Sequence, residues 1–311
     1  MHKPAIAFTS GDPAGIGPQA VLAALRRGPL SRLCRPLLVG EAAVWRRAGW
    51  RPGLWPLWDT GLGLRVPAYG RPSSAGGAAS FAAVAAGVRL AGRGLVAGLV
   101  TAPISKQAWA LAGVAFRDHT EYLRSVTGSD AQMILACPER GLWCVLATRH
   151  VPLRRVCGAL SADRVLAAAG ALHRALSRIT RRRPRLVLCG LNPHAGEGGR
   201  LGSEEGRILA PAVLRARRLG WDLSGPLPAD SAWRLHVRGG CDGLVCLYHD
   251  QALIGLKTAA GLDVVNWTAD LPFVRVSPGH GTAWDAAGTA RIDAGATRAA
   301  AALAVRLASR N

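Results

Sequence analysis

The fold is decided by Gly243-Leu244-Val245-Cys246-Leu247-Tyr248-His249-Asp250-Gln251, a stretch in which an apolar run leads directly into a histidine and a carboxylate. A short apolar run of this kind is typical of a buried strand. Open α/β sheets place their chemistry at the carboxyl ends of such strands. The stretch therefore predicts a largely parallel sheet with a functional group at the edge where its strands end.

Two other histidines follow apolar runs in the same way, His150 after residues 142–147 and His194 after residues 186–191. Three imidazoles with an open fourth position are the ligand pattern of a catalytic metal site. A single histidine at a strand end is more often a hydrogen-bonded structural residue, and these spacings are too long for a local motif. The hypothesis is that His150, His194 and His249 share one metal ion.

Apolar strand-like runs alternate with helical segments along the chain, for example a strand at residues 95–101 after a helix at residues 73–92. This alternation predicts an α/β fold, with a mostly parallel sheet and helices on both faces. A length of 311 residues exceeds one domain of common size, so two lobes are expected. Apolar runs at 131–136 and 142–148 predict a hairpin that opens the second lobe, and Ser161 is a suitable N-cap for a helix that ends near residue 180.

A glycine-rich loop at residues 10–18 lies between the first expected strand and the first expected helix. The backbone amides of such a loop can hold a phosphate. The G-x-G-x-x-G spacing of a dinucleotide-binding loop is absent. A plain turn is an equal alternative.

The formal charge of +20 raises nucleic acid or an anionic membrane as a partner. All but three of the 39 basic residues are arginine, and they are scattered apart from one short cluster at residues 181–183. This pattern favours a solvated basic surface, so we expect neither a nucleic-acid nor a membrane partner. Against that background Lys106 and Lys257 are conspicuous, because a retained lysine indicates a need for a compact ammonium group.

The seven cysteines include no C-x-x-C pair, which argues against a disulfide framework and against a structural zinc site. The amino terminus lacks the apolar region of a secretory signal. No apolar stretch approaches the ~20 residues that span a bilayer. These features predict a cytoplasmic protein.

A second group of residues carries cations and hydrogen-bonding groups. A lysine and an arginine can hold a phosphate together. Because we expect Lys257 to lie in the loop after His249, the anionic group of a metal-bound substrate would be held there. The alternative is a set of surface ion pairs, and His2, His173 and His236 are expected to be ordinary surface residues. The group comprises His119, Thr120, Lys257, Asn266 and Arg275.

Seven motifs, in order along nearly the whole chain, resemble those of the 4-hydroxythreonine-4-phosphate dehydrogenase family, the NAD-dependent enzymes of pyridoxal phosphate biosynthesis. Together they are far more specific than any one of them. The motifs are residues 11–18, 101–106, 119–121, 192–199, 225–230, 248–251 and 280–285.

The resemblance implies an isocitrate/isopropylmalate dehydrogenase-like α/β fold, with two α/β/α lobes around a central cleft, and a homodimer. Residues 1–127 plus 275–311 would form the first lobe, with the adenine loop of the cofactor. Residues 128–274 would form the second lobe, with the metal ligands and the dimer interface. The resemblance makes His150, His194 and His249 ligands of one divalent ion (zinc, magnesium, cobalt or manganese), with His249 supplied across the interface.

The same resemblance assigns the group of His119, Thr120, Lys257, Asn266 and Arg275 to substrate binding. It assigns His280, Gly281, Thr282 and Asp285 to the cofactor. A carboxylate at Asp285 would repel the 2′-phosphate of NADP, so NAD is expected. Asp250 and Asp230 are the candidates for the group that removes the proton of the substrate alcohol.

Several positions depart from the family pattern. Asp118 and Ala252 stand where glycine is expected, Gly255 replaces a proline, and Pro278-Gly279 replace valine and aspartate. Asp118 adds a negative charge beside the expected substrate site. These departures leave the exact substrate open.

The expected activity is oxidation of 4-phosphohydroxy-L-threonine to 2-amino-3-oxo-4-phosphooxybutanoate, a β-keto acid that decarboxylates to 3-amino-2-oxopropyl phosphate. One alternative is oxidation of threonate or erythronate 4-phosphate by the same machinery. The others are a metal-dependent hydrolase and a non-catalytic protein that retains the fold and binds anions or nucleic acid.

Overall fold

The computed structural model describes residues 3–26, 30–290 and 292–310. The chain forms two compact units. Unit 1 is Met1–Ala131 with Val265–Asn311, and unit 2 is Gln132–Val264. The chain therefore returns to unit 1 at β10 (Val265–Ala269), a strand that the boundaries drawn from the sequence assign to the second lobe.

Unit 1 holds strands in the order β3-β2-β1-β4-β11-β10. Neighbouring strands are parallel, except that β10 runs antiparallel to β11. The mostly parallel sheet expected from the sequence is therefore confirmed for this unit. Its strands are β1 (Ala5–Thr9), β2 (Arg35–Val39), β3 (Leu57–Trp58), β4 (Gly98–Thr101), β10 and β11 (Val274–Pro278).

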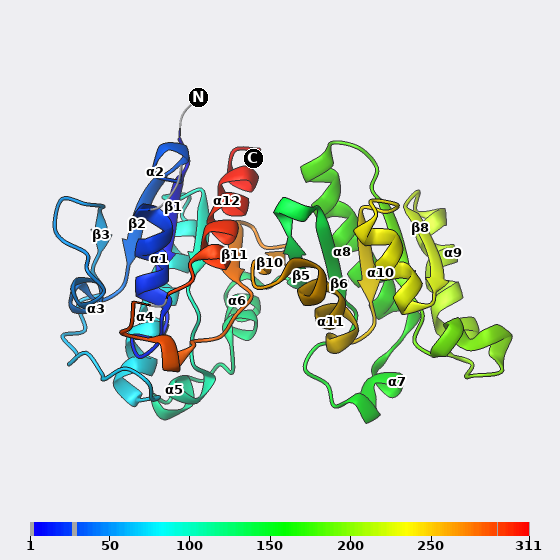
Figure 1. The fold of residues 1–311 in the computed structure, drawn as a ribbon, viewed down its shortest axis with the longest axis horizontal. Helices are drawn as coiled ribbons and strands as arrows, with labels where there is room; N and C mark the ends of the chain where they lie inside the picture. The colour runs from blue at the N-terminus through cyan, green and yellow to red at the C-terminus, as the bar shows by residue number, and fades with distance from the viewer. Residues whose placement is uncertain (1–2, 27–29, 291, 311) are drawn as a thin grey trace. The chain divides into compact units, whose positions relative to one another are not determined.

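Helices cover both faces of the unit 1 sheet (Figure 1). Helix α4 packs on the face that carries Ala7 and Leu99. Val100, the next residue along β4, points to the other face and is also fully buried, and α12 lies along β4 and β11 beside α1. The helices are α1 (Gly17–Arg26), α2 (Leu30–Leu33), α3 (Ala42–Arg47), α4 (Ser74–Gly92), α5 (Lys106–Leu111), α6 (His119–Thr127) and α12 (Gly295–Ala308).

Helix α4 begins where the sequence predicts. The Ser73 hydroxyl accepts a hydrogen bond of 3.0 Å from the Gly76 amide, which makes Ser73 the N-cap. Among the helices of the described residues, α4 alone is long and apolar enough to cross a membrane, which corrects the expectation that no apolar stretch approaches that length. Because 67% of its apolar window is buried inside the structure, packing accounts for that composition.

Unit 2 holds strands in the order β5-β6-β9-β7-β8. β5 and β6 form the predicted antiparallel hairpin, and the remaining neighbours are parallel. Its strands are β5 (Gln132–Cys137), β6 (Leu142–Leu146), β7 (Arg185–Cys189), β8 (Asp222–Leu227) and β9 (Gly243–Cys246).

Helices also cover both faces of the unit 2 sheet. Helices α10 and α11 pack on the face that carries Leu244 and Cys246. Gly243 faces the other way, where a Cβ atom would touch Leu172 and Leu176 of α8. Ser161 caps α8 as predicted, accepting from the Arg164 amide at 3.2 Å. The helices are α7 (Val156–Ala159), α8 (Ala162–Thr180), α9 (Ala210–Arg218), α10 (Ala229–Val237) and α11 (His249–Ala260).

Gly255 of α11 has no room for a side chain. A Cβ atom at this position would overlap the indole ring of Trp233 on α10. The indole is fixed, because its Nε1 donates a hydrogen bond of 2.8 Å to the Gln251 carbonyl. The glycine that replaces the expected proline therefore makes space for a tryptophan.

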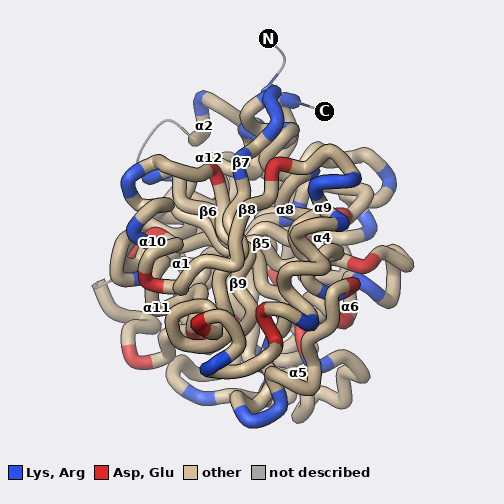
Figure 2. The backbone as a smooth tube through the Cα atoms, turned by 90° about the vertical axis from the view of Figure 1, so that its right-hand side faces the viewer, with Lys and Arg blue, Asp and Glu red and all other residues tan. Residues whose placement is uncertain are grey.

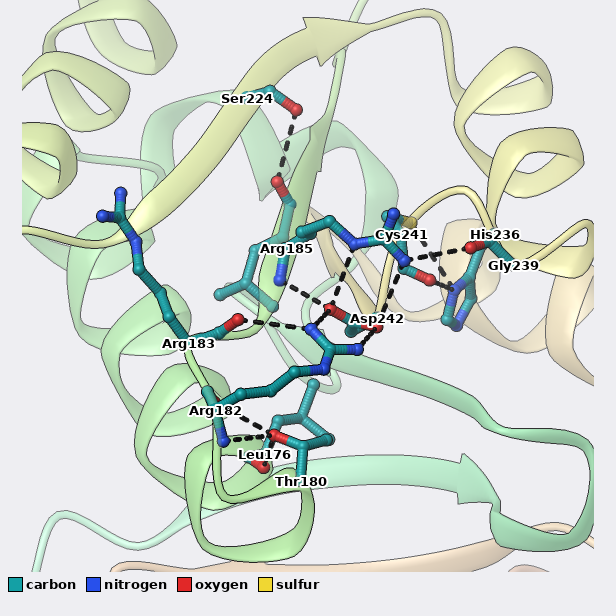
Figure 3. Close-up of polar contacts among 11 residues, drawn as sticks. Leu176, Thr180, Arg182, Arg183, Arg185, Ser224, His236, Gly239, Cys241 and Asp242 are labelled. Atoms are coloured by element: carbon teal, nitrogen blue, oxygen red, sulfur yellow. Dashed lines mark hydrogen bonds and ion pairs between the residues drawn. The ribbon is translucent and has the colours of Figure 1, made fainter.

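Asp242 ties the amino ends of β7 and β9 together (Figure 3). Its carboxylate accepts hydrogen bonds from the Arg185 amide at 2.7 Å and from the Arg182 guanidinium at 2.7 and 2.9 Å. Burial alone would raise the pKa of Asp242, but the bonds from Arg182 and Arg185 outweigh it and hold the pKa well below its usual value. The one arginine cluster of the sequence thus includes a residue that serves the fold.

The other basic residues are dispersed. Figure 2 shows Lys and Arg spread along the backbone tube and interspersed with Asp and Glu. This dispersal along the backbone agrees with the scattered arginines of the sequence.

His236 is buried, which corrects the expectation that it lies at the surface. Its Nε2 accepts a hydrogen bond of 2.9 Å from the Trp143 amide, and its Nδ1 lies 3.2 Å from the Cys241 carbonyl. Burial lowers its pKa. His173 is half-buried and stacks on Trp221, with ring centroids 5.4 Å apart. Both imidazoles are packing residues, and His2 lies outside the described residues.

Candidate functional site

The three histidines of the metal hypothesis stand at the carboxyl ends of three neighbouring parallel strands. β6, β9 and β7 lie side by side in that order. His150 follows β6, His249 opens α11 shortly after β9, and His194 lies in the turn after β7. Parallel strands bring their carboxyl ends to one edge of a sheet. The strand-end placement predicted from the sequence is therefore confirmed for all three.

His150 and His249 come together within one chain, with ring centroids 5.6 Å apart. Two imidazoles on one tetrahedral ion, with metal–nitrogen bonds of about 2.1 Å, have centroids about 5 Å apart. The pair therefore fits a shared ion. His249 Nδ1 lies 2.7 Å from Asp250 Oδ1, which leaves Nε2 for a metal. A carboxylate on the second ring nitrogen is the usual support of a histidine ligand.

His194 is not gathered with that pair in the structure. Among residues 3–26, 30–290 and 292–310, no three His, Cys, Asp or Glu side chains are grouped so that they could hold a metal ion. The three histidines therefore fit a shared metal ion in part. The imidazoles of His150 and His249 lie together, and His194 lies at the end of the adjoining strand β7.

Two of the three histidines have left-handed backbone conformations, His150 with φ 49° and His194 with φ 52°. Such conformations cost non-glycine residues roughly 1–3 kcal/mol each and concentrate at functional sites. Ala195 and Glu197 continue the left-handed turn after His194. The surrounding contacts must hold this turn in place, because its own backbone disfavours it.

Lys257 lies in the last turn of α11, and the prediction that it shares a loop with His249 is wrong. Leu256 and Ala260 are buried one turn apart, and this helical spacing continues α11 to residue 260. Eight residues of helix give a rise of about 12 Å between Lys257 and His249. Lys257 also belongs to unit 2, whereas Asn266 and Arg275 belong to unit 1.

Arg275 is the centre of a polar group in unit 1. Its side chain is buried, and its guanidinium donates to Thr101 Oγ1 at 2.6 and 3.1 Å and to Thr268 Oγ1 at 2.8 Å. Within the described residues no carboxylate forms an ion pair with it, and burial lowers its pKa to about 10. A buried charge is unfavourable without a partner. The arrangement is typical of a site whose anion is a ligand.

Two buried polar atoms near Arg275 lack partners in the described part of the chain, His119 Nε2 and Asn266 Oδ1. Asn266 shares a face of β10 with Thr268, which binds Arg275. Burial holds the pKa of His119 well below its usual value, and the charges of Arg275 and Lys106 lower it further. The sequence prediction that His119, Asn266 and Arg275 belong to one group agrees with this geometry, and Lys106 joins them.

Asp118 and Thr120 flank His119 at the start of α6. Asp118 Oδ1 accepts a hydrogen bond of 3.0 Å from the Glu121 amide, so Asp118 is the N-cap of this helix. Its charge also acts on Arg275, where it opposes the lowering of the pKa. The departure from glycine therefore adds a helix cap and a negative charge near the buried arginine. Thr120 is half-buried in the first turn.

The expected cofactor loop packs against the glycine-rich loop. The Ile16 amide donates to the Thr282 carbonyl at 3.0 Å, and a Cβ atom at Gly15 would lie 2.6 Å from that carbonyl oxygen. His280 Nε2 is buried and has no partner in the described ranges, and Asp285 is exposed. An unpartnered imidazole nitrogen and an exposed carboxylate both fit a nucleotide, whose ribose and base offer donors and acceptors.

The glycine-rich loop itself is a turn whose amides are already bonded. The amides of Asp12, Gly15 and Ile16 donate to backbone carbonyls, and the Ala14 amide donates to Asp12 Oδ1 at 2.9 Å. The structure therefore favours the plain turn over a phosphate cradle. Asp12 is buried, and burial raises its pKa, which the Ala14 amide and the nearby Trp284 side chain oppose.

Two residues to which the sequence assigns no site role hold the strand ends, Gln251 and Glu205. Gln251 Oε1 accepts from the Leu247 amide, and its Nε2 donates to the Gly190 carbonyl, both at 2.7 Å. Glu205 accepts from the amides of Leu191 and Asn192, both at 2.8 Å. The only signal in the sequence is their position, Gln251 beside a histidine and Glu205 after a glycine-rich segment.

Relatives with known names match nearly the whole chain. A 4-hydroxythreonine-4-phosphate dehydrogenase from Geobacter metallireducens is 39% identical, over 98% of this chain and 96% of its own. A protein from Symbiobacterium thermophilum, provisionally named D-threonate 4-phosphate dehydrogenase, is 38% identical over 94% of this chain and 93% of its own.

Solved structures agree. A 4-hydroxythreonine-4-phosphate dehydrogenase from Klebsiella pneumoniae has a TM-score of 0.85 and 35% identity, with 98% of each chain covered. A beta-decarboxylating dehydrogenase from Thermococcus kodakarensis has a TM-score of 0.52 at 14% identity, covering 96% of this chain and 82% of its own. At that identity the likeness concerns the fold alone, and it confirms the expected dehydrogenase-like fold class.

A family model described as pyridoxal phosphate biosynthetic protein PdxA matches residues 34–304. The matched residues include the strand-end histidines, the buried Arg275 group and the loop from His280. With this match and with relatives that align over nearly their full length, the chain belongs to the PdxA family.

Proposed function

We propose that this chain is a metal- and NAD-dependent 4-hydroxythreonine-4-phosphate dehydrogenase of pyridoxal phosphate biosynthesis. It oxidises 4-phosphohydroxy-L-threonine to 2-amino-3-oxo-4-phosphooxybutanoate, whose decarboxylation gives 3-amino-2-oxopropyl phosphate. The observation that carries the proposal is the buried Arg275 with no carboxylate partner among the described residues. A phosphorylated acid supplies the negative charge that this arginine lacks.

The proposed substrate contacts follow from the chemistry of each side chain. Arg275 holds an anionic oxygen with a planar fork, and Lys106 adds a point charge. His119 is neutral, because burial and two cations depress its pKa, and it offers Nε2 for one hydrogen bond. Asn266 Oδ1 is an acceptor, so it suits a hydroxyl or ammonium group of the substrate. Thr120 and Lys257 are further proposed contacts, from the family pattern alone.

His150, His194 and His249 are proposed to hold one divalent ion (zinc, magnesium, cobalt or manganese). Held by these histidines, such an ion would supply Lewis acidity toward the substrate alcohol and toward negative charge that develops on its oxygen. Asp250 fixes the ring orientation of His249. Asp230 and Asp250 remain the candidates for taking the alcohol proton, and the pH profiles of kcat for Asp230→Asn and Asp250→Asn separate them.

NAD is proposed to bind at His280, Gly281, Thr282 and Asp285. The exposed Asp285 carboxylate would repel the 2′-phosphate of NADP. Asp285→Lys should therefore improve kcat/KM for NADP relative to NAD. An unchanged preference would remove Asp285 from the cofactor site.

A cytoplasmic homodimer with the active site at its interface is also proposed. Unit 2 exposes large apolar side chains at Ile254 and Leu262, in and just after α11. Large exposed apolar side chains of this kind are available for burial in a subunit interface. All seven cysteines are free thiols, as a reducing compartment requires. Mass measurement in solution tests the dimer.

The decisive test compares substrates side by side. Purified protein with NAD and a divalent ion is given 4-phosphohydroxy-L-threonine, D-threonate 4-phosphate or D-erythronate 4-phosphate, and absorbance of the reduced cofactor is followed. We expect the highest kcat/KM for the amino acid. Preference for threonate 4-phosphate would support the rival activity, for which the Symbiobacterium relative is provisionally named.

Two controls address the remaining alternatives. Release of inorganic phosphate without NAD would indicate a metal-dependent hydrolase. Steeply salt-dependent DNA binding, without oxidation of any of the three substrates, would indicate a non-catalytic protein that retains the fold.

A further inference from the structure

We propose that Glu205 is a positioning residue for His194, one of the proposed metal ligands. The inference rests on the proposed metal site and extends it to a residue that touches neither metal nor substrate. It explains how a turn that is unfavourable for its own backbone is held at the carboxyl end of β7.

The buried Glu205 carboxylate accepts hydrogen bonds from the residues that lead into the turn of His194. The side chain is only 7% exposed. Its Oε1 accepts from the amides of Leu191 and Asn192, each at 2.8 Å. Its Oε2 accepts from Asn192 Nδ2 at 2.8 Å. Bonds to an ionised carboxylate are stronger than bonds between neutral groups. They fix the two residues through which the chain leaves β7 and approaches His194.

The turn closes over the same carboxylate. A Cβ atom at Gly196 would lie 2.7 Å from Glu205 Oε2, so only glycine fits there. His194, Ala195 and Glu197, around this glycine, have φ values of 52°, 53° and 43°. A left-handed run of non-glycine residues persists only where its surroundings determine it. The Glu205 carboxylate, which the turn encloses, is the contact that holds this backbone in place.

Two neighbouring carboxylates provide contrasts. Glu197 lies in the same turn and is exposed, so its charge can be removed without touching these bonds. Glu204 bonds the side chain of Asn192 at 2.9 Å and otherwise the backbone of its own segment, at Ser203 and Glu204. Glu205, by contrast, accepts from the backbone amides before His194 and also packs against Gly196 after it.

The test measures Co²⁺ affinity and the visible d–d absorption of bound Co²⁺ for the parent, Glu205→Gln, Glu197→Gln and His194→Ala. We expect Glu197→Gln to match the parent and His194→Ala to lose binding. Glu205→Gln should raise the Kd for Co²⁺ roughly 10–100-fold, as for residues that orient a metal ligand, and should change the absorption spectrum. Each variant is checked for a cooperative thermal melt.

A triple variant, Asn192→Asp with Glu204→Gln and Glu205→Gln, tests the contact itself. Asn192 donates to both glutamates in the parent, so the new amide nitrogens at 204 and 205 can donate to the new carboxylate at 192, and affinity should recover toward that of the parent. Parent-like Co²⁺ binding by Glu205→Gln, while His194→Ala loses it, would overturn the role of Glu205 and leave the metal site standing. Parent-like binding by His194→Ala would overturn the metal site and this inference with it. Loss of cooperative melting in Glu205→Gln, without recovery in the triple variant, would make Glu205 a general fold residue and also overturn the inference.

Discussion

Gln251 joins the end of β9 to Gly190 at the end of β7. Its Nε2 donates a hydrogen bond of 2.7 Å to the Gly190 carbonyl, and its Oε1 accepts one of 2.7 Å from the Leu247 amide. One buried carboxamide therefore bridges the two strands that lead to His249 and His194. The amide nitrogen and the oxygen of Gln251 are both required, because the Gly190 carbonyl can only accept a hydrogen bond and the Leu247 amide can only donate one.

Gln251→Glu should destabilise the protein. The new carboxylate keeps the bond to the Leu247 amide but places an oxygen against the Gly190 carbonyl. We expect the free energy of unfolding to fall by roughly 1–3 kcal/mol, the cost of unsatisfied buried polar groups, in urea denaturation. Gln107→Glu, at an exposed position of α5, controls for the added charge. Equal stability of Gln251→Glu and the parent would show that the bridge is dispensable.

Arg275→Met should impair substrate binding without impairing stability. The variant loses a charge-assisted bond to the substrate, which raises KM about 10–100-fold, since such bonds contribute roughly 1.5–3 kcal/mol. Its free energy of unfolding should equal or exceed that of the parent, because a buried cation without an ion pair is replaced by an apolar chain of similar length. Steady-state kinetics and urea denaturation measure the two effects. Arg298→Met, at an exposed arginine of α12, is the matched control. A large loss of stability in Arg275→Met would mean that Arg275 serves the fold.

Lys106→Met should raise the pKa of His119. The Lys106 charge is one cause of the low pKa of this imidazole, although burial is the largest and will keep the pKa below its usual value. The titration is followed by NMR of the ring nitrogens. Lys3→Met, at an exposed lysine, should leave it unchanged. If the pKa of His119 is also unchanged in Lys106→Met, Lys106 does not belong to the group around Arg275.

His236 should make stability depend on pH. Burial lowers its pKa in the folded protein, whereas the unfolded chain titrates near pH 6.5. Below about pH 6.5 the unfolded chain binds a proton that the folded protein does not, so stability falls as pH decreases. His236→Gln removes this dependence. The stability difference between parent and variant, measured in urea, should be largest near pH 8 and shrink toward about pH 5; a difference independent of pH would contradict the assignment.

Local patterns predicted much of the fold. Ser73 and Ser161 begin their helices, and the apolar runs before His150, His194 and His249 are strands, because caps and periodicity act within a few residues. The antiparallel β10 was assigned to the wrong lobe, since its partner β11 is chosen by pairing across the sheet and not by its own residues.

The contacts that complete the candidate site are not local. The bond between Gln251 and Gly190 spans 61 positions, and the bonds of Arg275 to Thr101 span 174. Sequence spacing cannot reveal such partners. His236 was misjudged for the same reason, because the amide that it accepts from belongs to Trp143, 93 positions away.

The contact between Gly255 and the Trp233 indole constrains the order in which this sequence can change. A proline at 255 has no space while the indole is present, so a smaller residue at 233 must come first. In the opposite direction, the glycine must precede the tryptophan. Position 255 therefore cannot regain a side chain until Trp233 has been replaced, whereas position 233 can change while Gly255 remains, so reversal can proceed in only one order.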